Sequence, residues 1–332
     1  MTRIAIVTDA WFPQENGVVR VLASVRDRLI ANGHTVGVLS PDGFRTMPCP
    51  TYPQVPLALF PGRRVAAWLD DWAPQAIHIA TEGPLGWAAR GWCLRRGRPF
   101  TTAFHTQFPA YVAKRTGLPL AWPYALMRRF HAPSHGVMVP SPGMLAELDR
   151  WGFANLREWT HGVDTKTFHP RPKTAFAGLA RPVFLYVGRV TVDKNLPAFL
   201  DLDLPGSKVV VGGGPSRETL IRDYPAARFL IARGDEELAA FYASADAFVF
   251  PSRTDTFGLV MLESLACGVP VAAFPEAGPL AVIGQSEAGV LDPDLRRAAL
   301  AALDIPAERC VAHAARFSWD AVAEGLVRCL AI

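Results

Sequence analysis

Short apolar runs alternate with helix-length stretches along most of the chain, and no other feature constrains the fold as strongly. Such alternation is typical of parallel sheets covered by helices on both faces. The pattern pauses once, at "WTHGVDTKTFHPRPKTAFAGLARP" (159–182), where Gly, Pro and basic residues gather. We therefore predict an α/β protein of two doubly wound domains, 1–165 and 175–315, with a final helix in 316–332 that packs back toward the first domain.

The strand and helix positions follow from these runs. The expected strands are "RIAIVT", "TVGVLS", "AIHIA", "PFTTAFH", "GVMVPS", "VFLYVGR", "KVVVGGGP", "ARFLI" and "AFVFPS". The expected helices lie near 18–32, 61–72, 84–96, 119–130, 142–151, 194–201, from 216, 236–245, 258–266 and 318–331. Ligands of such sheets bind beyond the carboxyl ends of the strands, so the residues that directly follow each strand are the functional candidates.

Composition excludes several classes of protein. The five cysteines are odd in number, widely spaced and without a C-x-x-C pair, which argues against a disulfide framework or a zinc site. Asp9 follows a short apolar run at the N-terminus, which indicates a first strand rather than a signal peptide. No apolar run reaches the length of a membrane span. We expect a cytoplasmic protein.

Basic residues concentrate in the first half of the chain. Residues 1–165 hold 17 Lys and Arg against 11 Asp and Glu, and no acidic residue lies between Glu82 and Glu147. The aromatic residues Trp87, Trp92, Trp122 and Tyr124 are interleaved with the basic ones in that segment. An anionic partner is expected there, although an ordinary basic surface over buried aromatics would read the same way. No nucleic-acid-binding module is visible.

Two glycine-containing loops follow strands in the second half. In "VFLYVGRVTVDKN", the strand stops at Gly188, and Arg189 and Lys194 follow. A guanidinium fork and an ammonium group suit a diphosphate, whereas the alternative is a loop with two solvated charges. In "VVVGGGPSRETL", Gly213 would let backbone approach a ligand, but a tight strand-to-helix turn explains these glycines equally well.

The stretch "RTDTFGLVMLESLACGVPV" (253–271) places two carboxylates around the start of a helix. Asp255 precedes the helix, and its alternative role is that of an N-cap. Glu263 lies inside the helix among apolar residues, so it needs a partner. The helix start would present backbone N–H groups to sugar or phosphate oxygens, from Thr256, Phe257, Gly258 and Leu259.

This stretch resembles the E-x7-E signature of retaining glycosyltransferases of family 4, which have the GT-B fold of two facing Rossmann-like domains with a donor cleft between them. Further motifs of that family appear in order: "NGVVRVL", "FHT", "VPSPGM", "HGVDTKTFHP", "VGRVTVDKN", "GGGP" and "YASADAFVFPS". The resemblance covers nearly the whole chain and implies a hexosyltransferase.

The resemblance also implies residue roles. Glu263 would bind the ribose of the nucleotide, Arg189 and Lys194 the diphosphate, and Asp255 the donor sugar together with the amides of Phe257 to Leu259. His105 would lie beside the transferred sugar as a catalytic residue with Arg189, Lys194 and Asp255, and Gly17 and Gly188 would bring backbone near the donor. The chain departs from the family in having Asp255 for a glutamate and Ile231 where a glycine shapes the base pocket, which leaves the sugar and the base open.

The expected reaction moves a sugar from a UDP-sugar to a membrane lipid such as diacylglycerol, at the inner face of the cytoplasmic membrane. Cations would neutralise the leaving diphosphate, so no metal is required. The acceptor and an anionic bilayer would lie against Arg63, Arg64, Trp68, Lys114, Arg115, Leu118, Leu120, Trp122, Arg128 and Arg129. The alternatives are a GDP-mannose donor, a soluble or polyprenyl-linked glycan acceptor, and a catalytically silent sugar-nucleotide-binding subunit.

Overall fold

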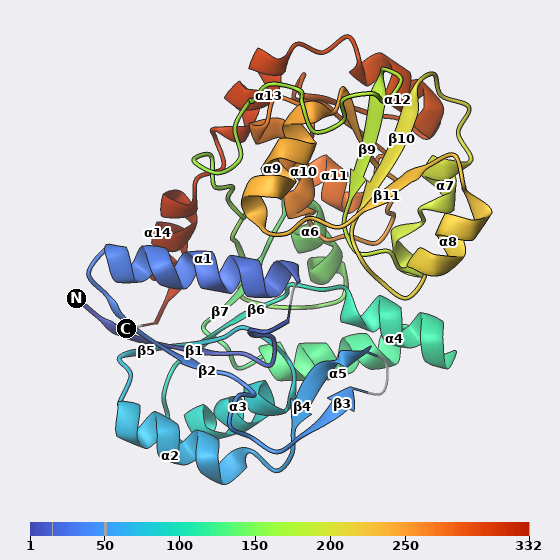
Figure 1. The fold of residues 1–332 in the computed structure, drawn as a ribbon. Helices are drawn as coiled ribbons and strands as arrows, with labels where there is room; N and C mark the ends of the chain where they lie inside the picture. Colours follow the sequence, from blue (N-terminus) through green and yellow to red (C-terminus); the bar gives the residue numbers. More distant parts are fainter. Residues whose placement is uncertain (15, 50–51, 332) are drawn as a thin grey trace. The chain divides into compact units, whose positions relative to one another are not determined.

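The computed structural model describes residues 1–14, 16–49 and 52–331 and divides the chain into two compact units (Figure 1). Unit 1 is Met1–His161 with Trp319–Ile332, and unit 2 is Gly162–Ser318. The segment 166–174, which the sequence leaves between the two predicted domains, belongs to unit 2. Phe168 and Phe176 are buried in the core of that unit, and Lys173 and Arg181 both bind Asp246.

Unit 1 contains a six-stranded parallel sheet in the order β2-β1-β5-β6-β7-β8. Its strands are β1 (Arg3–Val7), β2 (Thr35–Leu39), β5 (Ala76–Ile79), β6 (Thr101–Ala103), β7 (Gly136–Val139) and β8 (Leu156–Glu158). An antiparallel hairpin of β3 (Thr46–Cys49) and β4 (Tyr52–Ala58) follows β2, and the sequence does not predict it.

Seven helices of the described chain belong to unit 1. They are α1 (Gly17–Ala31), α2 (Gly62–Trp72), α3 (Pro84–Arg96), α4 (Phe108–Thr116), α5 (Ala121–His131), α6 (Pro142–Arg150) and α14 (Trp319–Cys329). Helix α14 lies beside α1, where Arg28 and Asp320 approach to 3.5 Å (Figure 1). The buried indole N–H of Trp159 donates to the Val322 carbonyl at 2.9 Å, which fixes α14 on this unit.

Unit 2 contains a second six-stranded parallel sheet, in the order β11-β10-β9-β12-β13-β14. Its strands are β9 (Val183–Val187), β10 (Ser207–Val211), β11 (Arg228–Leu230), β12 (Ala247–Phe250), β13 (Val271–Ala273) and β14 (Gly289–Leu291). Its helical segments are η1 (Val192–Lys194), α7 (Pro197–Leu200), α8 (Arg217–Asp223), α9 (Asp235–Ser244), α10 (Leu259–Ala266), α11 (Ala277–Val282), α12 (Leu295–Ala302) and α13 (Ala307–Ala314).

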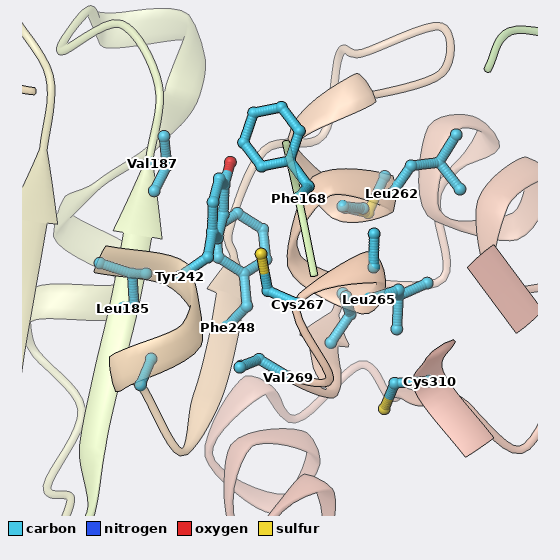
Figure 2. Packing of buried hydrophobic residues seen from close by; sticks show 14 of the residues in the cluster. Phe168, Leu185, Val187, Tyr242, Phe248, Leu262, Leu265, Cys267, Val269 and Cys310 are labelled. Carbon is cyan, nitrogen blue, oxygen red and sulfur yellow. The ribbon is translucent and has the colours of Figure 1, made fainter. Parts of the chain in front are cut away.

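The sheet of unit 2 is covered on both faces, which explains why its strands are apolar throughout. Along β9, Leu185 and Val187 join one buried cluster, and Phe184 and Tyr186 join another. Figure 2 shows the ring of Tyr242, from α9, lying between the β9 side chains and residues of α10. This cluster therefore connects the central strand of the sheet to the helix that carries the predicted Glu263.

Two of the three glycines after β10 are needed for packing. A Cβ at Gly212 would lie 2.0 Å from the Gly188 carbonyl oxygen, and one at Gly214 would lie 2.4 Å from that of Val190. Both glycines also have positive φ, of 145° and 152°. Gly213 has open space around it. The loops after β9 and β10 are therefore in backbone contact, and only the middle glycine is free to accept a side chain.

Replacing these glycines with alanine should separate packing from open space. We expect Gly212→Ala to lower the free energy of unfolding by roughly 2 kcal/mol or more, because it combines a backbone clash with a strained φ. Gly213→Ala should change that free energy by less than about 0.5 kcal/mol. Denaturant titration of both variants measures the difference, and equal losses would contradict the assigned backbone contact.

Candidate functional site

The sheet of unit 2 reverses its direction of growth between β9 and β12, because the chain runs outward from β9 to β11 and then returns to the other side. Ligands of open α/β sheets bind outside the carboxyl ends of the strands at such a reversal. The loops that leave β9 and β12 there carry Arg189, Lys194 and Asp255. The sheet topology thus places three predicted site residues at one edge.

Three side-chain interactions connect these two loops. The Lys194 ammonium lies 2.6 Å from Oδ1 of Asp255. The Asn195 amide donates to the Pro251 carbonyl at 3.1 Å, and the Thr254 hydroxyl donates to the Asp193 carbonyl at 3.4 Å. Asn195 has a φ of 55°, which ends the short helix η1 and turns the chain. The loops therefore form one connected surface.

The Lys194–Asp255 pair has an incomplete hydrogen-bond network. The two side chains are only 12% and 20% exposed, so water screens them weakly. Within the described residues, the buried Oδ2 of Asp255 has no hydrogen-bond partner. Buried carboxylate oxygens are normally satisfied, so this atom is a candidate acceptor for a ligand donor. The sequence assigns Lys194 and Asp255 to different parts of the donor, whereas the structure joins them directly.

Further ionisable groups surround the Lys194–Asp255 pair. Arg189 lies 3.9 Å from Asp193, at the end of the same loop. Burial tends to raise the pKa of Asp193, but the nearby polar groups and the positive charges of Lys194 and Arg189 outweigh it and hold that pKa below its ordinary value. Burial, and then the negative charges of Asp255 and Asp193, hold the pKa of Tyr186 well above its ordinary value.

Helix α10 begins at Leu259 without a side-chain cap. Its N-cap residue is Gly258, with a φ of 96°, and Asp255 binds Lys194 instead of the helix amides. The alternative role of Asp255 as an N-cap is therefore wrong. Phe257 is buried in the core and holds the loop down. A Cβ on Gly278 of α11 would lie 2.7 Å from the Asp255 carbonyl, so this helix supports the loop from behind, a contact that the sequence does not reveal.

Glu263 is nearly buried in α10, and the Tyr242 hydroxyl donates to its Oε2 at 3.0 Å. The sequence indicates that this carboxylate needs a partner, and Tyr242 is one. Tyr242 is the first residue of the motif "YASADAFVFPS", but the sequence does not pair it with Glu263, which lies 21 positions further along the chain. Burial, and then the negative charge of Glu263, raise the pKa of the neighbouring Cys267 thiol to about 12.

The remaining predicted residues of unit 2 follow neighbouring strands. Gly188 comes directly after β9, the open Gly213 follows β10, and Ile231 follows β11 with an exposed side chain. Thr256 lies in the loop between Asp255 and α10. The carboxyl ends of β9 to β12 thus carry every site residue that the sequence predicts for this unit, except Glu263 and Leu259, which are part of α10 itself.

In unit 1, His105 belongs to a cluster of rings. The Trp159 ring centroid lies 5.8 Å from that of His78, 5.9 Å from that of His105 and 6.0 Å from that of His161. Burial, followed by the neighbouring His161 and His78, holds the pKa of His105 well below its ordinary value. His105 is therefore a neutral ring near pH 7. Gly17 is the first residue of α1 and directly follows the N-cap residue Asn16.

The basic segment of unit 1 divides into structural and exposed residues. Arg90 donates to the carbonyls of Phe130 and Arg129, and Arg128 donates to that of Trp151. Trp122, by contrast, is 71% exposed on α5. The side chains of Lys114 and Arg115 lie outside the described part of the structure. Exposed apolar side chains near Trp122 are Leu118, Leu120 and Leu126.

Within the described residues, no helix is long and apolar enough to cross a membrane. The same residues contain no group of three His, Cys, Asp or Glu side chains arranged to hold a metal ion.

The buried His161 should make stability depend on pH. Burial lowers its pKa from 6.5 to about 4, so between these values the unfolded chain takes up a proton that the folded chain does not. Stability from this residue is present above pH 6.5 and is lost as the pH falls toward 4. Between pH 7.5 and 5, wild type should lose about 2 kcal/mol more than His161→Gln, measured by guanidinium titration. Equal losses would contradict the neutral, buried ring.

Comparison with known proteins identifies the family. Residues 15–167 match the model of Glycosyltransferase Family 4, and residues 181–305 match that of Glycosyl transferases group 1. A GDP-mannose-dependent alpha-mannosyltransferase of Mycobacterium tuberculosis (strain CDC 1551 / Oshkosh) is 30% identical over 320 residues, which cover 88% of this chain and 84% of that protein. Sulfoquinovosyl transferase SQD2 of Arabidopsis thaliana is 31% identical over 264 residues, covering 74% of this chain and 52% of its own length.

The solved structures agree on the architecture. A sucrose-phosphate synthase from Thermosynechococcus elongatus superposes with a TM-score of 0.79 at 21% identity, over 99% of this chain and 98% of that one. The predicted fold class is thereby confirmed. The chain belongs to glycosyltransferase family 4, and it is a hexosyltransferase built from the two Rossmann-like units of the GT-B fold.

Proposed function

We propose that the protein transfers a hexose, with retention of configuration, from a nucleoside diphosphate sugar to a hydroxyl group of a membrane lipid. The observation that carries this proposal is the Lys194–Asp255 pair at the reversal of the unit 2 sheet. The ammonium group supplies positive charge for a leaving diphosphate. The buried Oδ2 of Asp255, which has no hydrogen-bond partner among the described residues, would accept a hydrogen bond from the sugar.

The other donor contacts follow from the same edge. Arg189 would bind the diphosphate beside Lys194, and the open Gly213 leaves room for a ligand against the backbone. Glu263, with the hydrogen bond from Tyr242, would bind the ribose hydroxyls. Ile231 offers an exposed apolar surface for the base. Each of these contacts uses a residue that follows a strand of unit 2 or lies on α10.

In the proposed step, the bond between the anomeric carbon and the leaving phosphate oxygen breaks. The bond to the acceptor oxygen forms on the same face of the sugar, and the acceptor proton passes to an oxygen of the leaving diphosphate. No protein nucleophile is required. Arg189 and Lys194 stabilise the negative charge that develops on the diphosphate, which is why we expect activity without a divalent metal. The neutral His105 ring would hydrogen-bond the transferred sugar.

GDP-mannose is the first candidate donor, because a relative that is 30% identical and covers 88% of this chain is a GDP-mannose-dependent alpha-mannosyltransferase. A UDP-sugar, which the sequence resemblance favours, is the second candidate. Asp255 and Ile231 are the two residues through which this chain departs from the family motifs, so both bear on the choice.

The proposed acceptor surface is the exposed face of α5 and the residues before it. Trp122, Leu126 and Arg129 are spaced at i, i+4 and i+7, so they share one face of the helix, and all three are exposed. Large apolar side chains combined with arginine suit the surface of an anionic bilayer. We therefore propose peripheral attachment to the membrane through this face.

Removing the Lys194 ammonium should weaken donor binding. We expect Lys194→Ala to raise the Kd for GDP-mannose by about tenfold or more, because a charged hydrogen bond to the diphosphate is lost, and Lys194→Arg to retain most of the affinity. Lys173→Ala is the matched control, since Lys173 pairs with Asp246 at 2.7 Å in the same unit, before the amino ends of β9 and β12. Calorimetric titration measures the three constants, and equal effects of both alanine variants would contradict the site.

An assay with labelled donors tests the reaction itself. GDP-mannose, UDP-glucose, UDP-galactose and UDP-glucuronate are each supplied with vesicles of phosphatidylglycerol and diacylglycerol, with and without EDTA. We expect transfer to lipid from GDP-mannose, unchanged by EDTA, and weaker vesicle binding by a Trp122→Ser, Leu126→Ser variant. Transfer from none of the four would overturn the donor–acceptor pair. Transfer only to a soluble or polyprenyl-linked glycan, or binding without turnover, would favour the corresponding alternative.

A further inference from the structure

The sheet of unit 1 has its own reversal, between β1 and β5, and one carboxylate there has no assigned role. Glu82 follows β5 by three residues, and His105 follows the paired position Thr102 on β6 by three residues. Because Ile79 pairs with Thr102, Glu82 and His105 leave the sheet at the same level of its carboxyl edge. A ligand at this reversal would meet Glu82.

The Glu82 carboxylate is held by a buried histidine. Its Oε1 lies 3.2 Å from Nε2 of His131, and Nδ1 of that ring lies 2.8 Å from the Thr102 hydroxyl. His131 is 1% exposed, with Phe104 and Phe130 packed against its ring, whereas the Glu82 side chain is 18% exposed. The core thus fixes one end of the interaction, and the carboxylate reaches the surface at the other.

Capping of helix α3 does not account for Glu82. The helix begins at Pro84, and Asp9 accepts the amides of Leu85 at 3.0 Å and Gly86 at 3.4 Å. Asp9 is deeply buried, and burial is the main reason why its pKa is raised to about 6, with the negative charge of Glu82 adding to it. Asp9 therefore satisfies the first amides of helix α3, and the Glu82 carboxylate contacts His131 instead.

We propose that Glu82 binds a hydroxyl group of the acceptor, and that His131 and Thr102 are positioning residues that hold its carboxylate toward that hydroxyl. This inference rests on the proposed function. A carboxylate accepts hydrogen bonds from hydroxyl groups and repels phosphate, so the reacting end of the acceptor is an uncharged, hydroxylated head group. Glu82 thereby selects a glycerol or sugar hydroxyl against a phosphorylated head.

Glu82→Gln tests this role, because the amide oxygen can still accept a hydrogen bond from His131 while the charge is removed. For transfer to diacylglycerol in phosphatidylcholine vesicles, we expect the acceptor KM to rise about tenfold and the donor Kd to change less than about twofold. Glu147→Gln is the matched control, since Glu147 accepts a side-chain hydrogen bond from Tyr124 at 2.7 Å in the same unit. That variant should leave the acceptor KM unchanged. His131→Gln should raise the acceptor KM by a smaller factor than Glu82→Gln.

A binding measurement separates this inference from the proposed reaction. Water-soluble dioctanoylglycerol should raise the Tm of wild type and of Glu147→Gln, but not that of Glu82→Gln. Absence of a shift in wild type, or an equal shift in Glu82→Gln, would overturn the inference, as would a wild-type preference for phosphatidylinositol over diacylglycerol. Wild type that binds dioctanoylglycerol but transfers no sugar to it would overturn the proposed function and leave the assignment of Glu82 intact.

Discussion

The ion pair between Lys194 and Asp255 depends on a property of parallel sheets, namely that all strands end at the same edge. The two residues are 61 positions apart in the chain, yet the reversal of strand order between β9 and β12 sets their loops next to each other. The pair then joins the loops, Asn195 and Thr254 add two further connections, and Gly278 supports the second loop from behind. The positions of Arg189, Gly188 and the start of α10 all follow from this arrangement.

In unit 1, the carboxyl edge of the sheet carries side chains of a different kind from those in unit 2. Its polar groups there are largely neutral or already engaged: Asp9 serves helix α3, and the rings around Trp159 are uncharged near pH 7 because burial lowers their pKa. The Glu82 carboxylate is held by His131 and reaches the surface. A cationic and anionic pair in unit 2 suits a charged nucleotide, whereas a single fixed carboxylate in unit 1 suits a hydroxyl group.

Much of the fold could be predicted from the sequence, because strands buried on both faces must be apolar and the helices between them must be amphipathic. The β3–β4 hairpin was not predicted, because Pro48 and Pro56 interrupt the pattern that identifies a strand. The sequence also indicated that Glu263 needs a partner, but it could not identify Tyr242, because that residue lies on another helix, 21 positions earlier in the chain. Contacts such as Lys194–Asp255 and Glu82–His131 depend on strand order and register, and neither can be read from residue types alone. The glycines after β10 are visible in the sequence, but the reason for Gly212 and Gly214 is not. These two glycines are required because the backbone of the loop after β9 lies directly against them.

The attachment of α14 to unit 1 bears on the order in which the protein folds during synthesis. Unit 2 is continuous in the chain, whereas unit 1 lacks α14, and with it the Val322 carbonyl that accepts a hydrogen bond from the Trp159 indole, until the residues after unit 2 have been made. All residues of unit 2 are therefore synthesised before unit 1 is complete, although domains commonly fold in the order of their synthesis. Unit 1 is the first to be translated and the last to be complete.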